Sequence, residues 1–268
     1  MRDEDMDDED MDEFDEESIV DTLIPLIENA KLGKLTHLNV LKKYLKELSS
    51  FFELTYGEDK AQEFAALIED DEEFLNAISN IVNGDDFGWD RTDDLTESPQ
   101  LLELIFRYLC PLYQDIEFIL ANNPNLPFNV AKELITNDYR LDNGEDGSAA
   151  SIAAYAQDEK LLRLLAESSD SNARYRVAKN QLTPPDVLAK LADDTEQSSY
   201  PGIGVDVPGV PDWVSTHIKY AVIKNPSTPR VTLEEMIAGE HLLPSEANSD
   251  DLNLALQNEA RLALEPRI

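Results

Sequence analysis

Hydrophobic residues in the first part of the chain recur at the intervals of an amphipathic helix. Between Thr36 and Tyr56 they fall three, four or seven positions apart, which predicts a helix with one core-facing side: Leu38, Leu41, Tyr44, Leu45, Leu48, Phe51 and Phe52. We expect Thr36 to cap this helix and Gly57 to end it. An earlier apolar stripe over residues 19–27 predicts another helix.

Further helices are expected before the middle of the chain. Shorter apolar patterns predict helices near residues 58–69 and 71–83. Ser98 is a preferred N-cap and Pro99 a preferred first helical residue, so another helix should open there. We therefore predict that residues 18–115 form a helical, bundle-like N-terminal domain.

Two segments of the second half, residues 173–194 and 218–239, match closely when they are aligned. Each has a base before a tyrosine, then a valine, a Lys-Asn pair, a Thr-Pro pair and an apolar helical pattern. The matching residues are Arg174 and Lys219, Tyr175 and Tyr220, Val177 and Val222, Lys179 and Lys224, Asn180 and Asn225, Thr183 and Thr228, and Pro184 and Pro229. Such self-similarity indicates a structural repeat.

Two weaker copies come before these segments. Residues 117–138 keep Asn123 and Pro127 at the corresponding places, and residues 151–170 keep two helical patterns without the asparagine and the Thr-Pro pair. We expect each copy to be a pair of short helices. One pair cannot bury its own apolar face, so neighbouring pairs must stack.

The residues between the two helices of a copy have predicted structural roles. Asparagine tolerates the left-handed conformation past a helix end, threonine is a preferred N-cap, and proline suits the first helical position. Asp186, three residues after Thr183, would complete an arrangement similar to a capping box. The residues with these roles are Asn123, Pro127, Asn180, Thr183, Pro184, Asn225, Thr228 and Pro229.

The pattern Ala/Val–x–Asn–Pro–x–Thr–Pro before an apolar helix resembles the variant leucine-rich repeat, a short bacterial helical repeat similar in style to HEAT repeats. The resemblance covers roughly residues 116–240. It implies an all-α chain in which residues 116–268 form a short, irregular, right-handed α-solenoid of about four repeats with a C-terminal capping helix. Founding members carry a cysteine cluster for an iron–sulfur centre. This chain has only Cys110, so we expect no such cofactor.

Two insertions, residues 139–149 and 195–212, interrupt the copies. Insertions in a repeat array usually lie on one face and often contribute to binding. Tolerated surface loops are an equal alternative. If the insertions bind a partner, the expected contact residues are Tyr200, Asp206, Asp212, Trp213, Asp142, Glu145 and Asp146.

The chain is strongly acidic, with 56 acidic and 22 basic residues and a formal net charge of −34. Residues 1–17 hold twelve acids and one base, so we predict a disordered acidic tail. This tail either aids solubility or acts as a polyanion that mimics nucleic acid or engages a basic surface. The other residues still carry 44 acids and 21 bases. This excess of negative charge disfavours binding to phosphate backbones and to anionic lipid, and it favours binding to a basic protein.

The sequence holds no evident catalytic or metal-binding constellation. His37, His217 and His241 lie far apart without cysteine partners, and we expect His217 to be a surface or capping residue. The DNGEDG segment, residues 142–147, lacks calcium ligands at the third and twelfth positions of a calcium loop, so we interpret it as a turn. Cys110 is predicted to be a buried structural thiol.

Several features favour a cytoplasmic location. A single cysteine fits a reducing compartment. The N-terminus is acidic, whereas a signal peptide begins with basic residues. The most apolar run, residues 101–113, is short and contains Glu103 and Arg107, so it cannot cross a bilayer.

These observations favour a non-enzymatic helical-repeat module that binds a basic partner protein. A sharper form of the hypothesis is an inhibitor or immunity-type protein that blocks a basic effector such as a nuclease. The alternative is a nucleic-acid-processing or DNA-mimic repeat protein, because bases cluster on the first helices of two copies: Arg174, Arg176, Lys179, Lys219 and Lys224. A third interpretation attributes the acidity to a saline habitat, and the twelve lysines argue mildly against it.

Overall fold

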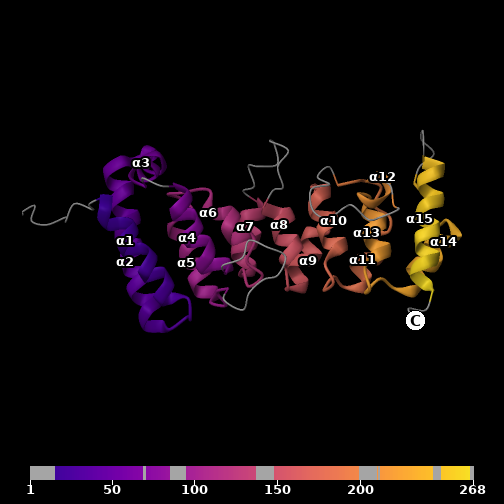
Figure 1. Cartoon of the computed structure of the whole chain (residues 1–268), viewed down its shortest axis with the longest axis horizontal. Coiled ribbons are helices and arrows are strands. Elements are labelled where there is room, and N and C mark those ends of the chain that lie inside the picture. Colours follow the sequence, from indigo (N-terminus) through magenta and orange to yellow (C-terminus); the bar gives the residue numbers. More distant parts are fainter. Residues whose placement is uncertain are drawn as a thin grey trace, which may run out of the picture. The chain divides into compact units, whose positions relative to one another are not determined.

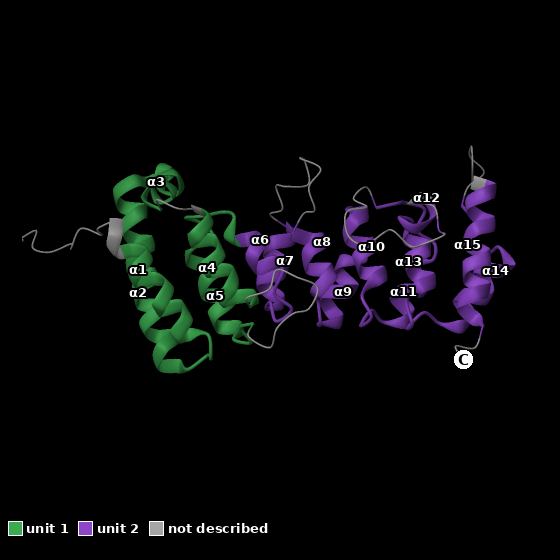
Figure 2. Ribbon diagram, viewed as in Figure 1, with its two compact units in different colours: residues 1–116 green, residues 117–268 purple. Residues whose placement is uncertain are grey.

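The computed structural model describes residues 16–68, 71–84, 95–136, 148–198, 210, 212–243 and 249–265 (Figure 1). Over these ranges the chain forms helices and turns without a strand, and an isolated bridge joins Gln197 to His217. The predicted all-α fold is therefore confirmed for the described residues. The chain divides into two compact units, residues 1–116 and 117–268 (Figure 2).

The first unit is organised around its longest helix, α2. The elements are α1 (Glu16–Ala30), α2 (Leu35–Tyr56), a 3-10 turn (Gly57–Asp59), α3 (Lys60–Leu67), α4 (Asp71–Asn83) and α5 (Pro99–Tyr108). α2 packs against α1, α3 and α5, and α1 also packs against α4. Because these neighbours cover one side of α2, its predicted apolar stripe is buried at Leu38, Leu41, Leu45, Leu48 and Phe52.

Aromatic rings from separate elements fill part of this core. The ring centroid of Phe64 on α3 lies 5.2 Å from that of Phe52 and 6.3 Å from that of Phe74 on α4. Tyr113, after α5, lies 6.4 Å from Phe64. All three pairs meet edge to face, which adds about 0.5–1.5 kcal/mol per pair beyond the burial itself.

The helix ends of the first unit test the predicted caps. Ser98 caps α5 by accepting a hydrogen bond from the Leu101 amide, with Pro99 as the first helical residue, as predicted. Gly57 ends α2 with a φ of 56°, also as predicted. The prediction that Thr36 caps α2 was wrong, because the N-cap is Lys34, two residues earlier, and its side chain makes no capping hydrogen bond.

The second unit consists of short helices. They are α6 (Ile116–Ala121, whose first residue closes the first unit), α7 (Phe128–Thr136), α8 (Ser148–Tyr155), α9 (Glu159–Leu165), α10 (Ser171–Lys179), α11 (Pro185–Leu191), α12 (Asp212–Ser215), α13 (Ile218–Lys224), α14 (Arg230–Ala238) and α15 (Ser249–Leu264). α10 packs between α8 and α13, and α13 in turn packs on α15. α9 contacts α7, α8 and α10, while α14 lies on α15.

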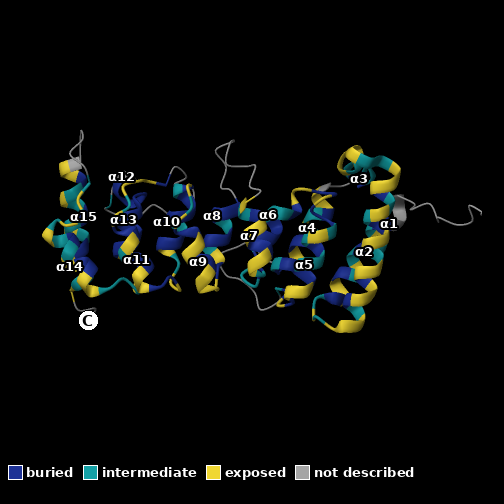
Figure 3. Cartoon of the chain, turned by 180° about the vertical axis from the view of Figure 1, so that it is seen from behind, coloured by how far each residue is buried: buried dark blue, intermediate teal, exposed yellow. Residues whose placement is uncertain are grey.

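α10 and α13 are buried on almost every side. Figure 3 shows both helices mainly in dark blue, and every residue from Ile218 to Ile223 is buried. A helix surrounded in this way must satisfy its polar side chains inside the protein. The polar side chains of α10 and α13 therefore need hydrogen-bond partners from neighbouring parts of the chain.

Candidate functional site

The contact residues expected in the two insertions lie largely outside the described residues. Asp212 and Trp213 open α12, but their side chains are outside the part of the chain that the structure describes. The other expected contact residues lie wholly outside it: Tyr200, Asp206, Asp142, Glu145 and Asp146.

Asn180 and Asn225 make equivalent hydrogen bonds. The side-chain amide of Asn180 donates to the carbonyl oxygens of Ala153 and Ala156 at the end of α8, both at 3.0 Å. The amide of Asn225 donates to the carbonyl oxygens of Ala178 and Asn180 at the end of α10, both at 2.8 Å. Each asparagine thus binds the C-terminal carbonyls of the preceding first helix, which otherwise lack intrahelical donors.

The backbone of these asparagines differs from the prediction. Asn180 has φ −66° and ψ 122°, and Asn225 has φ −72° and ψ 125°, so both are extended rather than left-handed. Each side-chain oxygen accepts an amide two residues ahead, from Leu182 and Ser227 respectively, at 2.9 Å. The asparagine therefore ends the helix by bridging to another helix, and a positive φ is not needed.

The two threonines also act differently from the prediction. The hydroxyl groups of Thr183 and Thr228 donate backwards to the carbonyl oxygens of Val177 and Val222, instead of capping the following helix. The N-caps of α11 and α14 are Pro184 and Pro229, which lack a side-chain cap. Both prolines therefore lie one position before the helix rather than in its first position.

The expected capping-box role of Asp186 was also wrong. Its carboxylate binds Arg163 of α9, with Nη1–Oδ2 and Nη2–Oδ1 distances of 2.6 and 3.0 Å. The Thr183 amide donates instead to the Asn180 carbonyl at 3.1 Å. A second ion pair joins Lys190 of α11 to Glu167, which lies just after α9. Polar groups between α9 and α11 thus link neighbouring helices instead of capping one helix.

The copy that contains Asn123 repeats part of this arrangement. Asn123 is buried, and its side-chain oxygen accepts the Asn125 amide at 2.8 Å, as in the asparagines of the later copies. Pro127 comes directly before α7, and its carbonyl oxygen accepts the Ala131 amide at 2.9 Å. Both residues therefore occupy the same local positions as Asn180 and Pro184.

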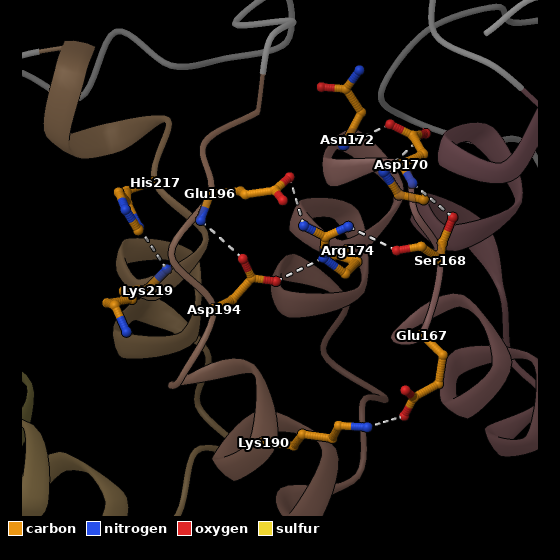
Figure 4. A network of polar contacts seen from close by, with 11 residues as sticks. Glu167, Ser168, Asp170, Asn172, Arg174, Lys190, Asp194, Glu196, His217 and Lys219 are labelled. Atoms are coloured by element: carbon orange, nitrogen blue, oxygen red, sulfur yellow. Dashed lines mark hydrogen bonds and ion pairs between the residues drawn. The ribbon is translucent and has the colours of Figure 1, made fainter. Parts of the chain in front are cut away.

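Arg174 of α10 is buried and lies at the centre of a polar network (Figure 4). Its Nε donates to Asp194 Oδ2 at 2.7 Å, its Nη2 pairs with Glu196 Oε2 at 2.8 Å, and its Nη1 donates to the Ser168 carbonyl at 2.7 Å. Burial lowers the pKa of the guanidinium, but the two carboxylates outweigh burial, so the pKa is raised overall. Arg174 thus joins the residues after α9 to those after α11.

Lys219 of α13 is the counterpart of Arg174. Its ammonium group donates to the carbonyl oxygen of Ala192, the C-cap of α11, and the residue is 1% exposed. Burial lowers the pKa of this lysine to about 8, although the charges of Asp193 and Asp194 oppose the shift. A cation at this position interacts favourably with the partial negative charge at a helix C-terminus.

We predicted that His217 is either a surface residue or a capping residue. It caps α13 and does not lie at the surface. Its Nδ1 accepts the Lys219 amide at 3.2 Å, and the residue is 1% exposed (Figure 4). Burial, followed by the charge of Lys219, lowers the pKa of His217 to about 4. The imidazole is therefore neutral near pH 7, which its role as a hydrogen-bond acceptor requires.

The remaining bases of α10 and α13 also contact groups of the chain itself. The ammonium groups of Lys179 and Lys224 lie 5.5 and 5.3 Å from the ring centroids of Tyr175 and Tyr220. Lys224 also pairs with Glu259 of α15 at 2.6 Å. The base cluster that suggested a nucleic-acid face is thus used largely within the second unit.

In the described part of the chain, no group of three or more His, Cys, Asp or Glu residues is arranged to hold a metal ion. Cys110 is buried, as predicted. None of the described helices combines the length and apolar character needed to cross a membrane.

Comparisons with protein-family models, curated proteins and solved structures find no match to this chain.

Proposed function

We propose that this chain is a helical-repeat interaction protein that binds a basic partner protein and performs no catalytic step. In this proposal, residues 116–268 are a short right-handed array of helix pairs of the variant leucine-rich repeat kind, closed by α15. The observation that carries it is the equivalent bonding of Asn180 and Asn225, each to the first helix of the preceding pair.

Stacking of similar pairs accounts for these contacts. Units that repeat place the same residue against the same part of the preceding unit each time. The order of packing, from α8 to α10, α13 and α15, fits such an arrangement because each of these helices contacts the next. The stacking of Lys179 on Tyr175 and of Lys224 on Tyr220 adds a second repeated contact.

The insertions enter at the same step of the proposed array. The first follows α7 and precedes α8, and the second follows α11 and precedes α12 and α13. In both cases the insertion lies between the second helix of one pair and the first helix of the next. Stacked pairs would bring both insertions to one edge, so their acidic and aromatic residues would form one contact surface.

The distribution of charge supports a basic partner. Arg174, Lys219 and Lys224 bind carboxylate or carbonyl oxygens of the same unit, so these bases do little to offset the acidic residues outside. Glu240, Asp250 and Asp251 are among the acids that are exposed. Such a surface accelerates encounter with a cationic protein and repels phosphate backbones. The nucleic-acid alternative lacks comparable support, because the bases on which it depends are engaged.

An inhibitor or immunity-type role against a basic effector is the sharper form of this proposal. To test the function, full-length protein would capture partners from a lysate of its native host. A captured protein would then be purified, and its Kd measured at 50 mM and 500 mM salt. We expect one basic protein whose affinity falls at least about tenfold between these conditions.

A pair of variants with equal charge change locates the contact. Neutralising the first insertion with D142N/E145Q/D146N should weaken binding, whereas E240Q/D250N/D251N, which removes three exposed charges elsewhere, should have a smaller effect. An affinity that is constant from low to high salt would contradict the electrostatic basis of the proposal. Binding of duplex DNA at moderate salt would instead favour the nucleic-acid alternative.

A further inference from the structure

The first unit contains a basic segment within this acidic chain. Residues 31–46 hold five of the twelve lysines and no acidic residue. They form the turn between α1 and α2 and the first turns of α2. The five bases are Lys31, Lys34, Lys42, Lys43 and Lys46.

The lysines on α2 share one face of the helix. Lys42 and Lys46 are one helical turn apart, and Lys43 lies beside them. Lys34, Lys42 and Lys46 are exposed, and the side chain of Lys43 is 79% exposed. In the described part of the chain, these lysines form one ion pair, between Lys43 and Glu47 at 3.7 Å. This contrasts with the bases of α10 and α13, which are engaged by the protein itself.

Large apolar side chains are exposed in the same segment. Leu32, Leu35 and Val40 are 78%, 72% and 55% exposed. Leu32 lies in the turn before α2, whereas Leu35 and Val40 lie on α2 itself. The turn is held to α2 by the hydrogen bond between His37 Nδ1 and the Asn29 carbonyl, at 2.7 Å. We call this region the lysine–leucine surface, composed of Lys31, Leu32, Lys34, Leu35, Val40, Lys42, Lys43 and Lys46.

We infer that the acidic N-terminal segment of this chain, residues 1–15, binds the lysine–leucine surface. This segment contains ten acidic residues and one base, with Met6, Met11 and Phe14 placed among the acids. Its carboxylates match the lysines, and its apolar side chains match Leu32, Leu35 and Val40. A ligand that matches both features fits better than an anion that offers charge alone.

The covalent connection makes this contact feasible. The segment joins α1 at Glu16, and the surface begins at the other end of α1, about 22 Å away at 1.5 Å per helical residue. Eight extended residues span roughly 27 Å, so the acids near Asp8 can reach the lysines. A short connection also gives an effective concentration of the order of millimolar, which suffices for a weak contact.

The same surface chemistry would also suit an anionic membrane. The observations favour the N-terminal segment, because it is tethered close to the lysines while the acidic remainder of the chain repels anionic lipid. This inference is independent of the proposed function, which rests on the second unit.

The test places a nitroxide spin label on the full-length chain at Asp8→Cys, since the buried thiol of Cys110 is shielded from the reagent. At 50 mM salt, the label should broaden amide resonances of residues 31–46 more than those of the far end of α2. At 500 mM salt the broadening should fall several-fold, because the Debye length shrinks from about 14 Å to about 4 Å.

Variants and mixed samples make the test decisive. K42Q/K43Q/K46Q should abolish the selective broadening, whereas K132Q/K160Q/K190Q, with the same charge change in the second unit, should keep it. Absent or uniform broadening would overturn the inference. So would broadening of isotope-labelled chains by spin-labelled second copies only, which means contact between molecules. Flotation of the full-length chain, but not of K42Q/K43Q/K46Q, with phosphatidylcholine–phosphatidylserine vesicles would assign the surface to lipid instead.

Discussion

Replacing Asn225 by alanine should destabilise the second unit by about 3 kcal/mol. The side chain is 5% exposed and makes three hydrogen bonds, two through its amide at 2.8 Å and one through its oxygen at 2.9 Å. Each such bond contributes about 1 kcal/mol net. In N225A, three backbone groups would lose the Asn225 side chain as a partner where water has little access: the carbonyls of Ala178 and Asn180 and the amide of Ser227.

Two further alanine variants provide the scale. Asn180 makes the same three types of bond but is only half-buried, so water can replace the lost partners and the cost should be about 1.5 kcal/mol. Asn258 is exposed on α15 and accepts one bond from Arg261, so its replacement should change stability by less than about 0.5 kcal/mol. We expect the order Asn225, Asn180, Asn258 from the largest cost to the smallest.

Urea unfolding followed by far-UV circular dichroism measures these costs. With an m-value of about 2 kcal/mol per molar, N225A should lower the midpoint of the second unit by about 1.5 M. The two units can unfold separately, so hydrogen exchange of the α13 amides should confirm which transition moves. If N225A costs no more than N258A, the asparagine bonds do not hold the helix pairs together, and the main support for the proposed array is lost.

Three more predictions concern neighbouring groups. R174M should cost about 2–4 kcal/mol because it leaves the Asp194 carboxylate, whose side chain is only 11% exposed, without its cation, whereas R174K should recover part of that loss, both measured by urea unfolding. T183V, which keeps the shape but removes the hydroxyl that bonds Val177, should cost about 1 kcal/mol, and a thermal melt with no shift would contradict this role. His217 has a pKa of about 4 in the folded state, below its ordinary value of about 6.5, so the unfolded state gains the proton first as the pH falls. The stability due to its neutral form should therefore decline between pH 6.5 and pH 4, and H217N, which retains a capping oxygen, should show a smaller decline in unfolding measured at pH 7 and pH 4.5.

Helices and their apolar faces could be predicted from the sequence because they depend on local spacing. The buried residues of α2 and the cap at Ser98 follow from periodicity and from the chemistry of one turn. Asn180, Thr183 and their counterparts could likewise be located, because the same letters return in two segments. Their positions could be predicted because the repeat pattern consists of residues that are close together in the sequence.

The partners of these residues could not be predicted in the same way. The amide of Asn225 binds a carbonyl 47 residues earlier, and Asn180 binds one 27 residues earlier, so spacing along the chain does not reveal either contact. A local rule assigned both asparagines to a left-handed turn and both threonines to caps, and the competing long-range bonds determine the geometry instead. The spacing likewise does not reveal that Arg174 and Lys219, which belong to the base cluster behind the nucleic-acid alternative, are both buried.

The contrast between two groups of bases connects the proposals for the two units. Arg174 and Lys219 are held against carbonyl oxygens near the ends of α9 and α11, where a positive charge offsets the helix dipole and donates to otherwise unpaired acceptors. These bases stabilise the fold, so the exposed acidic residues determine the sign of the surface charge of the second unit. The lysines of residues 31–46 have no comparable internal task in the described structure, and removing three of them should cost little stability. Their role must then lie in what they bind.

An acidic N-terminal segment bound to the lysine–leucine surface would leave fewer free carboxylates for a basic partner, so K42Q/K43Q/K46Q should bind such a partner more tightly than the unaltered chain. Equal or weaker binding would mean that the lysine–leucine surface and the surface that contacts the basic partner act independently.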